Sequence, residues 1–88
     1  MKIKNGFISR KVAGNNVVVA TGEQSKNFNG IIKLNESGLI LWNKLVLGAD
    51  KEILVSALLD EYDITRDVAE GDVDKFVGVL RNAGAIED

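Results

Sequence analysis

The spacing of apolar residues changes at Leu34–Asn35, and this change constrains the fold more than any other feature of the sequence. Before it, apolar residues fall in short runs or alternate with polar ones, as in strands. After it, they recur every three or four residues, as in amphipathic helices. No crossover helix separates the strand-like runs, so we expect them to pair as an antiparallel meander. The sequence therefore predicts an α+β fold, with a three-stranded antiparallel sheet followed by three helices, in one domain spanning residues 1–88.

Three segments before the change have the composition of strands. Residues 7–13 and 17–20 are rich in β-branched and apolar side chains, and Gly14–Asn16 between them has the composition of a turn. Both alternate sets of the first segment carry a cation, so we expect a thin edge strand that buries part of one face. Residues 21–27 are polar and predict a loop. The third strand, residues 28–34, has one apolar face and one mixed face.

Each of the three helices has a local start or stop signal. Asn35, Asp50 and Thr65 are good N-caps, and Gly48 and Gly84 are placed to end the first and third helices. The apolar stripes lie at Leu39, Trp42, Leu45 and Val46 in the first helix, at Ile53, Leu54, Ala57, Leu58 and Tyr62 in the second, and at Val68, Ala69, Val73, Phe76, Val77 and Leu80 in the third.

Composition argues against catalysis. The 88 residues include no cysteine and no histidine, which removes disulfides, thiolate metal ligands and the commonest general base together. The 13 carboxylates are spread along the predicted helices at solvent-facing spacings, and no serine has a histidine to activate it. No glycine-rich run matches a phosphate-binding loop. We therefore predict that the protein is not an enzyme and has no metal site and no cofactor.

Charge and hydropathy exclude further classes of function. The start of the chain has no apolar run typical of a signal peptide, and no apolar run approaches the length of a membrane span, so we expect a cytoplasmic protein. Strands with three helices could form a winged-helix DNA-binding regulator, which is the alternative function. Such a module needs a basic recognition helix, whereas the second and third predicted helices are net acidic. Nucleic-acid binding is therefore disfavoured.

A three-stranded meander leaves an exposed edge, and such an edge is a template for pairing. If the third helix lies beside residues 28–34, an extended peptide could add there as a further strand. Lys33, Lys75 and Arg81 could then steer an acidic peptide, and the same edge could pair with a second copy to form a homodimer. The simplest interpretation of six apolar residues is the core: Ile32, Leu34, Trp42, Leu58, Phe76 and Leu80. For six others, both a position in the core and a contact with the peptide remain possible interpretations: Phe28, Ile31, Lys33, Val73, Val77 and Arg81.

The ordered set of motifs resembles the PqqD family. The resemblance covers residues 7–88 and rests on Gly30–Gly38, Leu41–Trp42, Gly48, Ile53, Leu54, Leu58, Tyr62–Ile64, Asp72–Val73, Phe76, Leu80 and Gly84. It implies a small winged-helix-like domain called a RiPP recognition element. Such a domain binds the leader segment of a ribosomally made precursor peptide and presents it to a modifying enzyme, often a radical SAM protein.

The resemblance also implies where the peptide binds. The family places it beside the third strand and against the third helix, which here means Ile31, Ile32, Lys33 and Leu34 facing Val73, Phe76, Val77 and Leu80. Phe28 and Arg81 complete the candidate site. Residues 21–29 are longer and more polar than in the founding member, which favours a peptide pathway other than the synthesis of pyrroloquinoline quinone.

Overall fold

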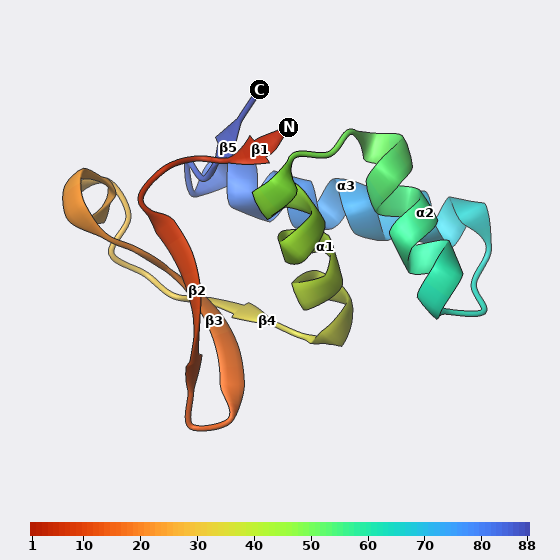
Figure 1. Cartoon of the computed structure of the whole chain (residues 1–88), viewed down its shortest axis with the longest axis horizontal. Helices are drawn as coiled ribbons and strands as arrows, with labels where there is room; N and C mark the ends of the chain where they lie inside the picture. Colours follow the sequence, from red (N-terminus) through yellow and green to blue (C-terminus); the bar gives the residue numbers. More distant parts are fainter.

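The computed structural model describes residues 1–88, the whole chain. Figure 1 shows the order of its elements. The first half holds β1 (Lys2–Ile3), β2 (Phe7–Val12), β3 (Asn15–Ala20), the 3-10 helix η1 (Gly22–Lys26) and β4 (Ile32–Leu34). The second half holds α1 (Glu36–Leu47), α2 (Lys51–Glu61), α3 (Arg66–Asn82) and β5 (Ile86–Glu87). The predicted α+β architecture, three antiparallel strands followed by three helices, is confirmed.

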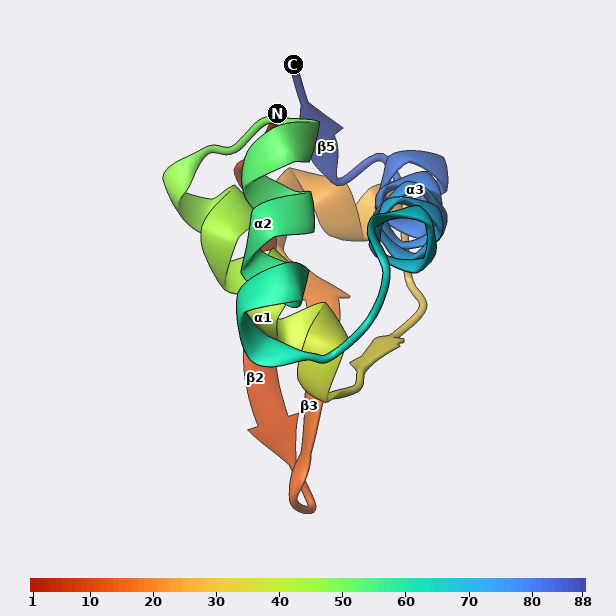
Figure 2. The ribbon, with the colours of Figure 1, turned by 90° about the vertical axis from the view of Figure 1, so that its right-hand side faces the viewer.

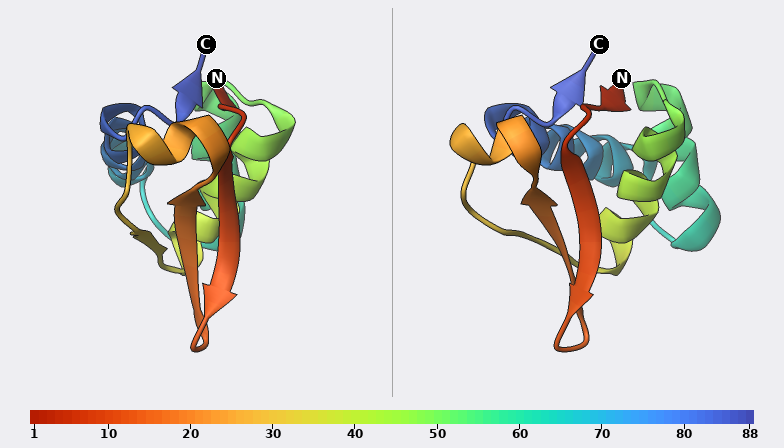
Figure 3. Two further views of the ribbon diagram at one scale, coloured as in Figure 1. Left: turned by 90° about the vertical axis from the view of Figure 1, so that its left-hand side faces the viewer. Right: turned by 60° about the vertical axis from the view of Figure 1, so that its left-hand side comes forward.

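The main sheet has β3 in its centre and two free edges, β2 and β4. β2 and β3 pair along their whole length, and the hairpin they form projects from the helices in Figures 1 and 3. β4 pairs only with the middle of β3, with Ile32 opposite Val18 and Leu34 opposite Asn16. In β2 only Phe7 is buried, which confirms the prediction of a thin edge strand.

The three helices begin where the sequence predicts. The side-chain oxygens of Asn35, Asp50 and Thr65 each accept a hydrogen bond from the backbone N–H three residues later. These bonds satisfy donors that would otherwise be left without partners in the first turn. Gly48, with a φ of 94°, ends α1. The helix starts are therefore set by short-range chemistry that needs no tertiary contact.

The core lies between the helices and the inner face of the sheet. Its fully buried large side chains come mainly from the helices and comprise Trp42, Leu41, Leu45, Leu54, Leu58, Leu80, Val18, Val55 and Val73. The predicted stripes were too wide, because Val46, Ile53 and Val68 are each about half exposed. Single apolar residues at the margin of a stripe commonly remain at the surface, since a small domain cannot cover every apolar atom.

Three details of the strand region differ from the prediction. The first turn is Ala13–Gly14, not Gly14–Asn16, and both residues have positive φ, as a two-residue hairpin requires. This tight turn lets β3 begin at Asn15 rather than at residue 17. Residues 22–26 form η1 instead of a plain loop. The third strand is shorter than residues 28–34, because only Ile32–Leu34 pair with β3.

A second sheet brings the two ends of the chain together. β1 and β5 pair antiparallel, with Ile3 opposite Ile86, and both chain ends lie at the same side of the molecule in Figure 1. Met1 also accepts a hydrogen bond from the backbone N–H of Ala49, at 2.8 Å. This pairing was not predicted, because two-residue strands carry no periodic signal. None of the helices combines the length and apolarity needed to cross a bilayer.

Candidate functional site

A groove runs between the free edge of β4 and the side of α3. Figure 2 looks nearly along the axis of α3 and shows β4 and the start of α1 beneath it. We call this hollow the β4–α3 groove; its volume is about 470 Å³ and its lining residues are Ile32, Lys33, Asn35, Ser37, Gly38, Leu41, Asp72, Lys75, Phe76 and Val79. One wall is therefore a strand edge with unpaired backbone groups, and the other is a helix face.

The floor of the groove depends on a missing side chain. Gly38, in the first turn of α1, is buried, and a β-carbon added to it would lie 3.3 Å from Cε1 of Phe76 and 3.6 Å from Cδ2 of Leu34. The Phe76 ring therefore lies directly over the backbone of α1. Leu41, 2% exposed, continues the apolar floor beyond it. A β-carbon at position 38 would therefore require the Phe76 ring to shift by a few tenths of an ångström.

The walls of the groove expose apolar surface to solvent. Val79 on α3 is 46% exposed, and Ile31, just before β4, is 66% exposed. Ile32 and Phe76 are partly buried and pack on the core with one side while lining the groove with the other. Exposed apolar side chains beside an unpaired strand edge are typical of a surface that takes up an extended peptide.

The charged side chains of the groove have no partner within the chain. Lys33 on β4 and Lys75 on α3 form no ion pair, and neither does Asp72, whereas the four ion pairs of the molecule lie elsewhere. Free charges at the rim of an apolar groove are available to a ligand. They would affect the rate and selectivity of binding more than its strength.

The structure brings together only part of the predicted site. Ile32, Lys33 and Phe76 line the β4–α3 groove, and Ile31 lies exposed next to it. Three other predicted residues point into the core, with Leu34 7%, Val73 1% and Leu80 0% exposed. They support the walls of the groove from behind.

The remaining three predicted residues lie outside the groove. Val77 and Arg81 line a separate hollow on the other side of α3, next to Met1. Arg81 donates to Asp88 at 2.8 Å, and this hydrogen bond raises the pKa of Arg81 and lowers that of Asp88. Phe28 packs on Phe7, with ring centroids 6.0 Å apart. Of the three cations proposed to steer a peptide, Lys33 and Lys75 line the groove and Arg81 does not.

Sequence reasoning missed Gly38, Leu41, Asp72 and Val79. A signal for two of them was present, since Asp72 and Val79 stand four residues before and three residues after Phe76 and so share its face of α3. Gly38 and Leu41 carried no such signal. Their role depends on how α1 crosses α3, which is a tertiary property.

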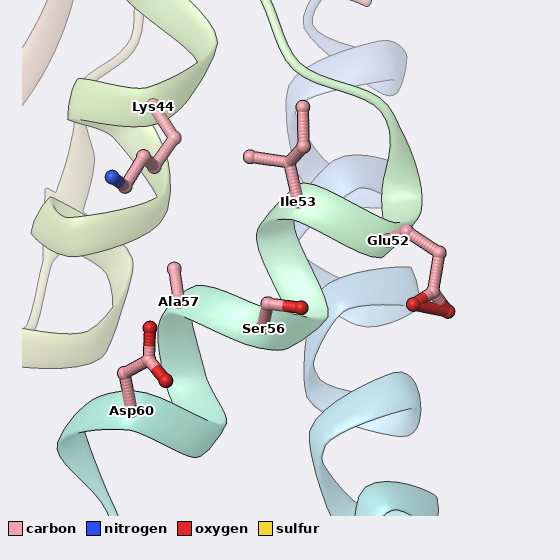
Figure 4. A pocket seen from close by; sticks show the side chains of 6 residues that line it. All are labelled: Lys44, Glu52, Ile53, Ser56, Ala57 and Asp60. Atoms are coloured by element: carbon pink, nitrogen blue, oxygen red, sulfur yellow. The ribbon is translucent and has the colours of Figure 1, made fainter.

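A different hollow, between α1 and α2, is a poorer candidate for a functional site. Figure 4 shows Lys44 on α1 across from Ile53, Ala57 and Asp60 on α2. This hollow includes Ser56, but no histidine exists in the chain to activate that hydroxyl. It also borders no free strand edge. No group of three or more acidic side chains in the chain is arranged to hold a metal ion.

Comparison with known proteins points to one family. The family model for coenzyme PQQ synthesis protein D, PqqD, matches residues 16–86. A solved structure of TbiB1 in complex with the TbiA(beta) leader peptide is similar, with a TM-score of 0.79 and 25% identity over 99% of this chain and 95% of that one. Lasso peptide synthetase B1, complexed with the leader peptide, shares the fold at a TM-score of 0.77 and 17% identity, over 99% and 96% of the two chains. No curated protein matches the sequence significantly.

Proposed function

Because this chain belongs to the PqqD family, we propose that it is a peptide-binding accessory protein that holds the leader segment of a precursor peptide in the β4–α3 groove. The observation that carries this proposal is the free edge of β4 across an open groove from a helix wall that presents Phe76 and Val79. The similar fold of TbiB1, solved with a leader peptide, supports the same function. The peptide would add to β4 as a fourth strand.

The other free edge is a poorer candidate. β2 contributes no residue to the β4–α3 groove, and it carries the exposed cations Arg10 and Lys11. Charged side chains on an edge strand are a common protection against unwanted pairing. β4 differs because a helix wall with exposed apolar side chains lies next to it. An added strand at β4 would therefore gain side-chain contacts as well as backbone hydrogen bonds.

Stable binding of a peptide requires contacts with both walls of the groove, the β4 edge and α3. Each backbone hydrogen bond to β4 contributes a net ~0.5–1.5 kcal/mol. Association costs about 4–15 kcal/mol in lost freedom. Because β4 has only three residues, its edge alone cannot offset this cost. Two or three apolar side chains of the peptide, at ~1.5–3 kcal/mol each, would have to bury themselves against Phe76, Val79 and Ile31.

The protein would act without chemistry of its own, as one binding domain over residues 1–88, in the cytoplasm. It would present the bound precursor to a modifying enzyme, and the family resemblance suggests a radical SAM protein. The likeness to TbiB1 and lasso peptide synthetase B1 supports a ribosomal peptide pathway other than pyrroloquinoline quinone synthesis. The free edge of β4 could also pair with a second copy, so a leader peptide would compete with a homodimer.

An NMR titration with leader segments of precursor peptides encoded near the gene tests the proposal. We expect amide shifts to concentrate at residues 31–38 and 72–79, with little change at β2, β5 or the first half of α2. Duplex DNA of mixed sequence serves as a control and should cause no shifts. Scattered shifts, or none with the peptide that the partner enzyme modifies, would contradict the proposal. Sedimentation with and without peptide shows whether a homodimer forms and whether peptide dissociates it.

A further inference from the structure

The β4–α3 groove does not end where β4 ends. A second hollow of about 350 Å³ shares Asn35, Ser37 and Asp72 with it, so the two form one continuous depression. The second hollow lies over the first turn of α1, beside the end of α2 and the loop that follows. We call it the Tyr62 hollow; its other lining residues are Glu36, Leu58, Tyr62 and Ile64.

The Tyr62 hollow combines apolar walls with two carboxylates. Tyr62 and Ile64, which are both partly buried, provide the apolar surface over the fully buried Leu58, and no lysine or arginine lines the hollow. Glu36 accepts a hydrogen bond from the Tyr62 hydroxyl at 3.1 Å, which positions its carboxylate at one side. Asp72 of α3 also lines the hollow and has no ion-pair partner. A long aliphatic side chain with a cationic end matches such a hollow.

The positive end of the α1 dipole also lies here and opposes a cation. It is equivalent to about half an elementary charge, whereas Glu36 and Asp72 together carry two negative charges. The carboxylates therefore dominate the local field. Along the whole depression the charge thus changes sign, from Lys33 and Lys75 beside β4 to Glu36 and Asp72 beyond it.

We propose that the Tyr62 hollow binds a lysine or arginine side chain of the same peptide, just beyond the segment that adds to β4. This site depends on the proposed function of the β4–α3 groove, because one peptide fills both hollows. The basic residue would lay its stem on Tyr62 and Ile64 and direct its charge to Glu36 and Asp72. The hollow would thereby set the register of the peptide along β4, which backbone hydrogen bonds alone leave free to slip.

Selection from a displayed library of random peptides, long enough to span both hollows, tests this site. The wild-type protein should enrich peptides that carry alternating apolar residues and a lysine or arginine at a constant distance from them. Asp72→Lys should enrich aspartate or glutamate at that distance and keep the apolar positions. Asp67→Lys makes the same charge change on the same helix, five residues away on a different face, and should give the wild-type pattern.

Affinities of individual selected peptides measure how much the basic residue contributes to binding. Replacing the basic residue by glutamine should weaken binding to the wild-type protein about fivefold, and should not weaken binding to Asp72→Lys. Apolar positions without any basic preference, or an unchanged preference in Asp72→Lys, would overturn the Tyr62 site and leave the groove intact. If none of the enriched peptides loses its binding in the Val79→Asp variant, the groove is not the binding site, and the Tyr62 site is overturned with it.

Discussion

Ala13 is the one residue other than glycine with a positive φ, 50°, and it forms the β2–β3 turn together with Gly14, whose φ is 82°. This conformation costs an L-residue with a β-carbon roughly 1–2 kcal/mol, and it costs asparagine or glycine less. We therefore expect Ala13→Asn to raise the free energy of unfolding by about 0.5–1 kcal/mol, since Asn-Gly suits this hairpin turn. Urea denaturation followed by the fluorescence of the buried Trp42 measures the change. Gly14→Ala should have the opposite sign, and a destabilised Ala13→Asn would contradict the turn.

Gly71 and Gly38 offer a matched pair of helical glycines. A β-carbon at Gly71 would meet nothing within 4 Å, so Gly71→Ala should stabilise the protein by roughly 1 kcal/mol. At Gly38 the β-carbon would lie 3.1 Å from Oδ1 of the cap residue Asn35 and 3.3 Å from the Phe76 ring. Gly38→Ala should therefore lack this gain and should weaken peptide binding by displacing Phe76. Denaturation curves and peptide titrations of both variants check this. Equal stabilisation by the two substitutions would show that Asn35 and Phe76 shift without cost to make room for the added methyl group.

At the scale of elements, α3 presents different faces to different surroundings. Ala69, Val73 and Leu80 are buried in the core, while Phe76 and Val79 face the β4–α3 groove. α3 also runs without interruption through Gly71. This division explains why one helix can both stabilise the fold and bind a ligand. A substitution on the groove face should affect binding alone, and one on the core face should affect folding first.

Val79→Asp tests this division. Val79 is 46% exposed, so the charge remains in solvent and the free energy of unfolding should change by less than about 0.5 kcal/mol. Peptide affinity should fall at least tenfold, because an apolar contact is replaced by a charged group. Val46→Asp is the matched control, since Val46 is a helical valine with 47% exposure and lines no part of the groove. Equal losses of affinity in both variants, measured by calorimetry, would count against the groove.

Helices were predicted more accurately than strands, and the reason is local. Asn35, Asp50 and Thr65 cap their own helices within one turn, so each signal lies next to the boundary that it sets. The limits of β4 depend instead on how many residues pair with β3. Residues 28–31 alternate as a strand would, but Phe28 packs on Phe7 and this part of the chain leaves the sheet. Alternation alone does not reveal that.

At the scale of the whole molecule, the two ends of the chain are joined by the β1–β5 pair, and the last residue, Asp88, forms an ion pair with Arg81 of α3. That bond lowers the pKa of Asp88 below its ordinary value of 3.8. Its stabilising effect is therefore fully present above that value, and it is lost as the pH falls through the lower pKa of the folded state. Arg81 remains protonated throughout this range.

Asp88→Asn should consequently lower stability slightly at about pH 7, and this difference should shrink as the pH falls through the lowered pKa of Asp88. Urea denaturation of both proteins at a series of pH values, from neutral to acid, measures the effect. Peptide affinity should be unchanged, because Arg81 lies outside the β4–α3 groove. A difference in stability that persists in acid, or a loss of peptide binding, would contradict these assignments.

The sequence by itself determined the order of the main-sheet strands and the three helices, the helix starts, the thin strand β2 and the lack of histidine and cysteine, because these follow from composition and from contacts within a few residues. The family resemblance in the sequence indicated a peptide ligand at the third strand. Only the tertiary structure decided which candidate residues share a surface. The rotation of α3 placed Phe76 and Val79 in the groove, Val73 and Leu80 in the core, and Arg81 with Asp88. A helical repeat defines the faces of a helix, but the neighbours of each face are set by packing over the whole chain.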